Sequence, residues 1–217
     1  MAYQVRTASA VTRTFSVVVC GLTLLATACT TDTSTSPSPN STDVGLVAVS
    51  VDEVRNITGI TDFHDIPELN VTTPAANPDT PEPCRAVFDP PTVFGSDWQR
   101  FRAVGYAADL DAPLLPIMAD VRQAIAVYPD ATTAQATFDR VAAAIPGCIK
   151  TGTGYYRRTA ESPDPNTLLL NSDHADGAHS AYRLAGTALI SVGVLGLPDS
   201  ARVVLAILDG IEQAQHP

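Results

Sequence analysis

The sequence of 217 residues lacks the short motifs that mark common catalytic sites. It contains no G-x-S-x-G nucleophile elbow, no G-x-x-x-x-G-K-[ST] phosphate loop and no H-E-x-x-H zinc motif. It has no C-x-x-C pair either, which argues against redox and metal sites built on paired cysteines. We therefore predict no catalytic residue, no metal site and no cofactor.

Positive charge is scarce. Thirteen Lys and Arg residues stand against 23 Asp and Glu residues, so the formal net charge is −10. An acidic chain is not drawn by electrostatic attraction to the phosphates of nucleic acids or to an anionic lipid surface. We expect no nucleic-acid partner.

Long hydrophobic runs are also missing. The apolar run at 15–25 has about eleven residues, too few for a helix that crosses a bilayer core of roughly 30 Å. Arg6 and Arg13 precede this run and no acidic residue does, which is typical of a signal peptide. The later run at 187–197 is interrupted by glycine and stops at Pro198.

The run leads into Ala26-Thr27-Ala28-Cys29, which resembles the lipobox of bacterial lipoproteins, with Ala26 where leucine is commonest. The resemblance implies cleavage before Cys29, acylation of Cys29 and retention at the outer face of the cell membrane. Residues 1–28 are then a lipoprotein signal peptide, and loss of Arg6 and Arg13 lowers the formal charge from −10 to −12. The alternative is an ordinary secretory signal that leaves Cys29 as a free thiol.

Residues 29–43 are rich in Thr, Ser and Pro, carry no large apolar residue before position 43, and are predicted to be a disordered tether. Residues 44–217 form the folded domain. Its two cysteines, Cys84 and Cys148, are predicted to form a disulfide, because an even pair outside the cytoplasm is normally oxidised. The closed loop of about 65 residues would stabilise the fold by roughly 4 kcal/mol.

Capping and periodicity place three helices. The first runs over 51–58 between Ser50 and Gly59, the second begins after Asp130 and ends at Pro146-Gly147, and the last opens at 198–200. Residues 61–83 are predicted to be a long proline-rich loop. Strands are expected at 101–108, 118–128, 154–158, 167–170, 181–184 and 188–194, with turns at 162–165 and 173–177. Because strands cluster instead of alternating with helices, the fold class is α+β, a single domain with a largely antiparallel sheet packed by helices.

The order of motifs over roughly 46–214 resembles the extracellular sensor domain of PknH-type receptor kinases, which also occurs in stand-alone lipoproteins. The resemblance implies a fold with a cleft for an extracellular ligand and no established catalytic residues. Many members carry a second disulfide, whose cysteines would fall near Ser180 and Leu195 and are absent here. The motifs that carry it are Leu46, Ser50, Glu53-Val54, Thr58-Gly59, Pro83-Cys84, Phe94-Gly95-Ser96, Trp98, Gln123-Ala124, Tyr128-Pro129-Asp130-Ala131, Cys148 and Ile190-Ser191-Val192.

Aromatic residues supply the candidates for a ligand cleft. Core packing is assigned to Phe88, Phe94 and Phe101. Trp98 and the Tyr155-Tyr156 pair are preferred for the cleft, since adjacent residues on a strand face opposite ways. Arg157 beside them could meet an anionic group.

Two polar clusters offer weaker signals. Asp173 to His179 could form a metal or acid–base site, but Asp and Gly also serve turn geometry there. Asp62 to Asp65 could hold a cation or cover a pocket, with a solvated loop as the alternative.

The leading hypothesis is an anchored, non-catalytic, sensor-like lipoprotein that binds an unidentified small-molecule or envelope ligand. It would need a membrane protein partner to pass on a signal, because no kinase domain or membrane-spanning helix accompanies it. The alternatives are a lipid or glycolipid carrier, which needs an apolar cavity, and an envelope hydrolase, which needs a nucleophile or a carboxylate pair converging in a cleft.

Overall fold

The structure is a computed structural model that describes residues 46–110, 117–152, 154–172 and 177–215. These described residues all belong to one compact unit. Every buried hydrophobic residue of the described ranges lies between Leu46 and Ile211, so a chain that begins at Thr42 carries this core complete. The predicted signal peptide, tether and Cys29 lie outside the described residues.

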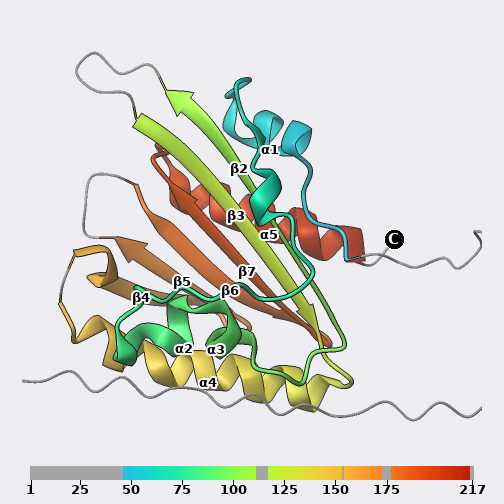
Figure 1. Cartoon of the computed structure of the whole chain (residues 1–217), viewed down its shortest axis with the longest axis vertical. Helices are drawn as coiled ribbons and strands as arrows, with labels where there is room; N and C mark the ends of the chain where they lie inside the picture. Colours follow the sequence, from blue (N-terminus) through green and yellow to red (C-terminus); the bar gives the residue numbers. More distant parts are fainter. Residues whose placement is uncertain (1–45, 111–116, 153, 173–176, 216–217) are drawn as a thin grey trace, which may run out of the picture. The chain divides into compact units, whose positions relative to one another are not determined.

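A seven-stranded antiparallel sheet is the centre of the unit, with the strand order β1-β2-β3-β7-β6-β5-β4 (Figure 1). The pairing of β3 with β7 joins the first hairpin to the later strands. The strands are β1 (His64–Asp65), β2 (Arg100–Leu110), β3 (Ile117–Val127), β4 (Arg158–Asp164), β5 (Thr167–Ser172), β6 (His179–Ala185) and β7 (Ala188–Leu195).

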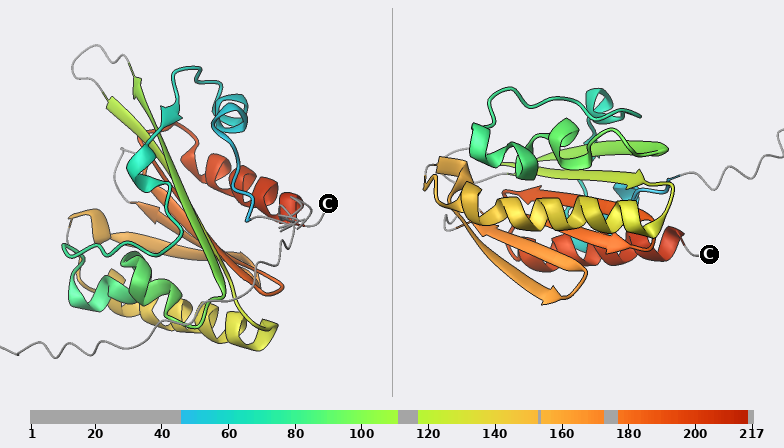
Figure 2. Two further views of the ribbon diagram at one scale, coloured as in Figure 1. Left: turned by 45° about the vertical axis from the view of Figure 1, so that its right-hand side comes forward. Right: turned by 90° about the horizontal axis from the view of Figure 1, so that it is seen from below.

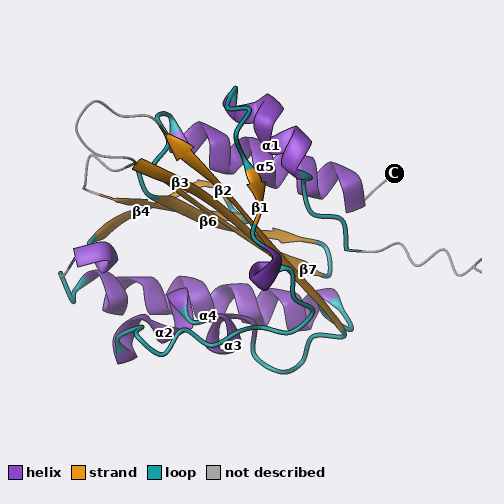
Figure 3. Ribbon diagram, turned by 45° about the horizontal axis from the view of Figure 1, so that its top comes forward, coloured by secondary structure: helices purple, strands orange, loops and turns teal. Residues whose placement is uncertain are grey.

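Helices cover both faces of this sheet, as Figure 3 and the left view of Figure 2 show. Helices α1 (Val51–Thr58) and α5 (Ser200–Gln215) lie on one face, called here the first face. Helices α2 (Arg85–Phe88), α3 (Pro90–Phe94) and α4 (Ala131–Ile149) lie on the second face. The α+β fold with an antiparallel sheet packed by helices is thereby confirmed.

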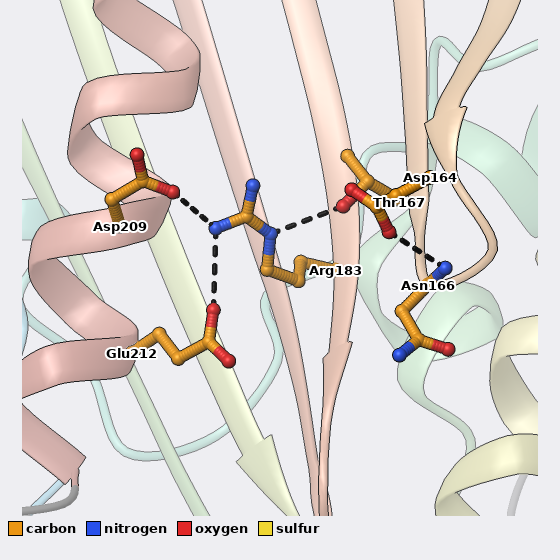
Figure 4. Close-up of polar contacts among 6 residues, drawn as sticks. All are labelled: Asp164, Asn166, Thr167, Arg183, Asp209 and Glu212. Carbon is orange, nitrogen blue, oxygen red and sulfur yellow. Dashed lines mark hydrogen bonds and ion pairs between the residues drawn. The ribbon is translucent and has the colours of Figure 1, made fainter.

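The core on the first face joins α1 and α5 to alternate residues of the strands. The predicted stripe of the last helix is confirmed, because its members are fully buried there: Val204, Ile207, Leu208 and Ile211. Arg183 on β6 adds a polar connection to α5, pairing with Asp209 at 2.5 Å and Glu212 at 3.3 Å (Figure 4). Its Nε also donates to Thr167 Oγ1 on β5, so this arginine ties two strands to the helix.

The core on the second face packs α4 against the sheet. Asp130 caps α4 by accepting a hydrogen bond from the Thr133 N–H, as predicted, and the stripe of Ala134, Phe138, Val141 and Ile145 is buried. The Cys84–Cys148 disulfide is present with a Cα–Cα distance of 4.4 Å and joins α4 to the 3-10 turn η2 (Glu82–Cys84).

Helix α4 does not end at Pro146-Gly147 as predicted but continues to Ile149. A proline removes one backbone donor, yet Ile145 and Cys148 lie three residues apart on the buried stripe. Packing of that stripe and the disulfide outweigh the missing hydrogen bond.

The predicted strand at 154–158 is also wrong. Gly152 and Gly154 have positive φ angles of 61° and 47°, so the backbone turns there. Residues Gly154–Tyr156 form the 3-10 turn η3, and β4 begins only at Arg158. Strand β4 also runs through Ser162, Pro163 and Asp164, where a turn was predicted, with an irregular register between Glu161 and Asp164.

The loop predicted over 61–83 is more ordered than the prolines indicated. It contains β1, the 3-10 turn η1 (Pro67–Leu69), η2, and a bridge between Val71 and Ala103 of β2. Short backbone pairing to an edge strand is compatible with prolines, since only alternate residues need to donate.

Candidate functional site

A groove of about 430 Å³ lies over the second face of the sheet. It is bounded by that face, by α2 and α3, and by residues 67–77, which we call the strap. Figure 3 shows the strap leaving β1 on the side of the sheet that carries α2, α3 and α4. The volume is within the range of ordinary small-molecule sites.

The floor of the groove consists of small residues. Cross-strand partners share a face, so two rows of the sheet can be followed across four strands. One row is Gly105, Arg122, Gly193 and Ser180, and the next is Ala103, Ala124, Ser191 and Tyr182. Apart from Arg122 and Tyr182, these residues have short side chains or none, which leaves room between the sheet and the elements that cover it.

Two glycines of the floor have different surroundings. A Cβ on Gly105 would lie 2.3 Å from Leu69 Cδ1, so this glycine permits the strap to approach β2. A Cβ on Gly193 would meet no atom within 4 Å. Gly193 therefore faces open space in the groove, whereas Gly105 is needed for packing.

Large apolar side chains form the walls. Phe94 and Phe101 contact each other edge to face, with ring centroids 5.1 Å apart. They belong to the second core and line the groove at the same time. The other apolar wall residues are Leu69, Val71, Phe88, Pro90, Val93 and Tyr182.

The α2–α3 wall is held by side chains that donate to its backbone carbonyls. Tyr128 donates to Phe94 O at 2.9 Å, Tyr182 donates to Val87 O, and Arg140 of α4 donates to Val93 O at 3.0 Å. Burial raises the pKa of Tyr128 to about 12, so its hydroxyl stays protonated and can donate. With the disulfide at Cys84, these bonds make this wall a preorganised surface.

The strap is attached at three points: Leu69 on Gly105, Val71 on Ala103, and Asn77 at Asp89. Asp89 accepts from the Asn77 N–H at 2.8 Å and from Thr92 Oγ1 at 2.6 Å. Burial acts to raise the pKa of Asp89, but these hydrogen bonds outweigh it and lower the pKa below its usual value. Asp89 therefore joins the strap to α3 as a carboxylate.

The row through Gly193 carries two polar residues of the groove, Arg122 and Ser180, and Ser191 stands in the next row. Ser180 is only 7% exposed, and its hydroxyl finds no hydrogen-bond partner within the described residues. Arg122 is 65% exposed and pairs with Asp120, with Nε 2.9 Å from Oδ1 and Nη2 3.2 Å from Oδ2. Glu68 of the strap also lines the groove.

The residues chosen from sequence for the cleft are not among those that line this groove. Trp98 donates to Gly95 O at 3.1 Å and packs 5.8 Å from the Phe101 ring, so it supports a wall from behind. Tyr156 does the same for Phe88, at 5.5 Å. Tyr155 and Arg157 lie in and just after η3, Arg157 is exposed, and the side chain of Tyr155 is outside the described set.

The lining residues that sequence reasoning did not select are chiefly Arg122, Ser180 and Gly193. A signal for them exists: β2, β3 and β7 each place consecutive small residues on the second face, such as Ala103 and Gly105, or Ser191 and Gly193. Glycine inside a strand indicates a bulge or a close approach to the backbone. The sequence did not show which face was concerned or that the space above it was open.

The histidine clusters provide no metal site within the described residues. No group of three or more His, Cys, Asp or Glu side chains there could hold a metal ion. His179 shares a hydrogen bond of 2.5 Å with Ser200 Oγ, but Ser200, the first residue of α5, is only 1% exposed. His174 lies outside the described residues, and His64 is exposed near Asp62.

None of the helices in the described ranges combines the length and hydrophobicity that a bilayer crossing requires. The longest, α4, has 19 residues and carries charged side chains on its exposed side.

Comparison with known proteins agrees with this architecture. The model of the PknH-like extracellular domain family matches residues 39–213, so the chain belongs to that family. The extracellular domain of PknH from Mycobacterium tuberculosis superposes with a TM-score of 0.58 at 16% identity, covering 76% of this chain and 93% of that one. A search of curated protein sequences finds no match. The chain is thus an extracytoplasmic domain of the PknH-like type.

Proposed function

We propose that this protein is a lipoprotein anchored through Cys29 to the outer face of the cell membrane, and that its domain binds a small-molecule or envelope ligand without catalysing a reaction. The observation that carries the proposal is the groove over the second face, with open space above Gly193 and the unpartnered Ser180 hydroxyl beside it. A buried hydroxyl that lacks a partner in the protein is a site where a ligand gains a hydrogen bond. A membrane protein partner would carry the signal across the bilayer.

A lipid or glycolipid carrier is the second candidate, favoured by the phenylalanine walls of the groove. Both the sensor and the carrier need a ligand in the groove. They differ because a carrier would transfer its ligand to another molecule or membrane, whereas a sensor would not. The hydrolase reading gains no support from the His179–Ser200 pair, because the serine hydroxyl is buried away from the groove.

The test is native mass spectrometry of residues 42–217 purified from its own envelope extract, beside the variant Gly193→Val. A valine at this strand position fills the open space, and β-branched residues suit strands, so the variant should remain at least as stable as the wild type. We expect a co-purifying mass on the wild type that the variant loses.

Gly147→Ala, on the exposed side of α4, is the matched control and should keep the bound mass. A clean apo mass in repeated wild-type preparations, or a mass that Gly193→Val retains, would contradict ligand binding in this groove.

A further inference from the structure

We propose that the groove receives an uncharged amphipathic molecule whose apolar body lies against the phenylalanine wall and whose hydroxyl-bearing head lies over Gly193. This inference rests on the proposed function, because it names the ligand class of the same groove. It follows from the apolar surface around Phe94, Phe101, Ala103 and Ala124, from the polar groups that surround Gly193, and from the balance of charge there.

The apolar end is formed by Phe94, Phe101, Ala103 and Ala124, and the row of the two alanines continues into Ser191, next to the polar end. Ala103 and Ala124 are direct cross-strand partners, so their methyl groups form a flat floor beside two aromatic rings. A surface of this kind removes an apolar body from water and offers little to a polar one.

The polar end is the row Arg122, Gly193 and Ser180 on three neighbouring strands. Adjacent strands lie about 4.8 Å apart, so the Cα atoms of Arg122 and Ser180 are roughly 10 Å apart, with Gly193 between them. A compact polar group above Gly193 would reach the Ser180 hydroxyl on one side and the Arg122 guanidinium on the other. The buried Ser180 hydroxyl, which has no hydrogen-bond partner among the described residues, favours such a group there.

Charge at this end favours a neutral head. The Arg122 guanidinium is already matched by the Asp120 carboxylate, and Glu68 stands on the strap side of the groove. An anionic head would have to displace Asp120 and approach Glu68, while a cationic head would meet Arg122. Hydroxyl groups both donate and accept, so they fit the guanidinium, the carboxylates and the serine together.

Three probes with alkyl tails of nearly equal length separate these classes: octyl β-glucoside, octanoate and octyltrimethylammonium, each titrated below its micelle concentration into residues 42–217. We expect octyl β-glucoside to bind at least tenfold more tightly than either charged probe, and Gly193→Val to abolish its binding. Equal or tighter binding of a charged probe overturns the inference, and so does glucoside binding that survives Gly193→Val.

Two further variants test the contacts of the head. Ser180→Ala should weaken glucoside binding about fivefold, the equivalent of one hydrogen bond, without lowering the melting temperature, because the hydroxyl has no partner to lose. Ser162→Ala on the exposed part of β4 is the matched control and should change neither property. Asp120→Asn should improve octanoate binding, since it frees Arg122, and should not improve glucoside binding. If Ser180→Ala binds octyl β-glucoside as tightly as the wild type does, the inference is overturned.

The experiments distinguish an error in the proposed ligand class from an error in the proposed binding function. A charged molecule that co-purifies with the wild type and is lost in Gly193→Val would overturn the neutral head while the binding function stands. Absence of any groove-dependent ligand or probe would overturn both.

Discussion

Gln123 is a polar residue in the middle of the core on the first face, 2% exposed. Its Oε1 accepts from the Val49 N–H at 2.9 Å, and its Nε2 donates to Val49 O at 3.0 Å. The same carbonyl accepts from the Tyr106 hydroxyl at 2.9 Å. The Gln123 side chain thus pairs with the Val49 backbone as a neighbouring strand would. It satisfies the buried N–H and C=O groups of Val49, which water cannot reach.

Replacing this amide tests its importance. Gln123→Leu should lower the free energy of unfolding by about 2–3 kcal/mol, because the buried Val49 N–H loses its acceptor and the carbonyl one of two donors. Urea unfolding of residues 42–217 measures the change. Gln135→Ala removes an exposed amide bonded to Asp139 and should cost less than about 0.5 kcal/mol. An equally small cost for Gln123→Leu would contradict the role given to Gln123.

His179 should make stability depend on pH. Burial lowers its pKa, Arg158 acts in the same direction, and the Gly177 backbone and Glu161 oppose them without reversing the shift. A histidine with a lower pKa in the folded state binds its proton more weakly there than in the unfolded chain. Stability is therefore retained above the ordinary pKa of 6.5 and is lost as the pH falls below it through the folded-state pKa.

The melting temperature between pH 7.5 and pH 5 checks this expectation. The wild type should lose more stability over that interval than His179→Gln, which leaves Ser200 a hydrogen-bonding partner. His64→Gln, at an exposed position, should behave like the wild type. Parallel profiles for the wild type and His179→Gln would contradict a contribution from His179.

Local signals at single residues were readable from sequence. Ser50 and Asp130 cap their helices, and Gly59 ends the first in the left-handed conformation, because each interaction spans only a few residues. Val121, Gln123 and Ile125 were correctly placed on one face of their strand. The partner of Gln123 lies 74 positions away, and no local pattern contains that information.

Among the elements, α2 and α3 depend most on connections to others, since they have four and five residues. Helices this short are not stable alone. Their fixation comes from the disulfide at Cys84 and from three side-chain donors, among them Tyr128 and Arg140.

Removing the disulfide should therefore loosen the α2–α3 wall more than the rest. Cys84→Ser with Cys148→Ser opens a loop with a sequence separation of 64, and should cost about 4 kcal/mol. Hydrogen exchange should quicken first at residues 82–94, while β3 and β7 remain protected. Uniform loss of protection across the sheet would show that the bond holds the whole fold and not this wall.

Two elements were missed from the sequence, one decided by tertiary packing and one by the backbone conformation of two glycines. Pro146 normally ends a helix, yet packing of Ile145 and Cys148 carries α4 onward. The Tyr155-Tyr156 pair favoured a strand, whereas positive φ at Gly152 and Gly154 turns the backbone away. The opposite facing of Tyr155 and Tyr156 assumed a strand, and the structure has the 3-10 turn η3 there; neither tyrosine lines the groove over the second face.

At the scale of the whole molecule, acylation of Cys29 remains a prediction. Cys29→Ser should move the protein from the membrane fraction to the soluble fraction, because the acyl chains that hold it would be missing. Detergent phase separation and the intact mass of the mature protein measure this. Cys20→Ser, in the part of the signal peptide that is cut off, should leave the protein in the membrane fraction. Membrane retention of the Cys29→Ser protein would favour another mode of attachment.

The fold class was available from the sequence because hydrophobic periodicity and turn residues give the order of the elements. The groove was not, because it depends on Gly193 and Ser180 from β7 and β6 lying beside Arg122 from β3. These residues become neighbours only because β7 pairs with β3, and the two strands are about 70 residues apart in the sequence.

The amino-terminal and carboxyl-terminal ends of the described domain lie close together, since Gln215 at the end of α5 donates to Val47 O at 3.0 Å. Both ends belong to the first face, and the groove opens on the second. A fluorophore or reporter protein fused to either end would leave the ligand entrance uncovered. A tethered copy of the domain could therefore be immobilised on a surface through its natural amino-terminal end, and still sample the solution with its binding face.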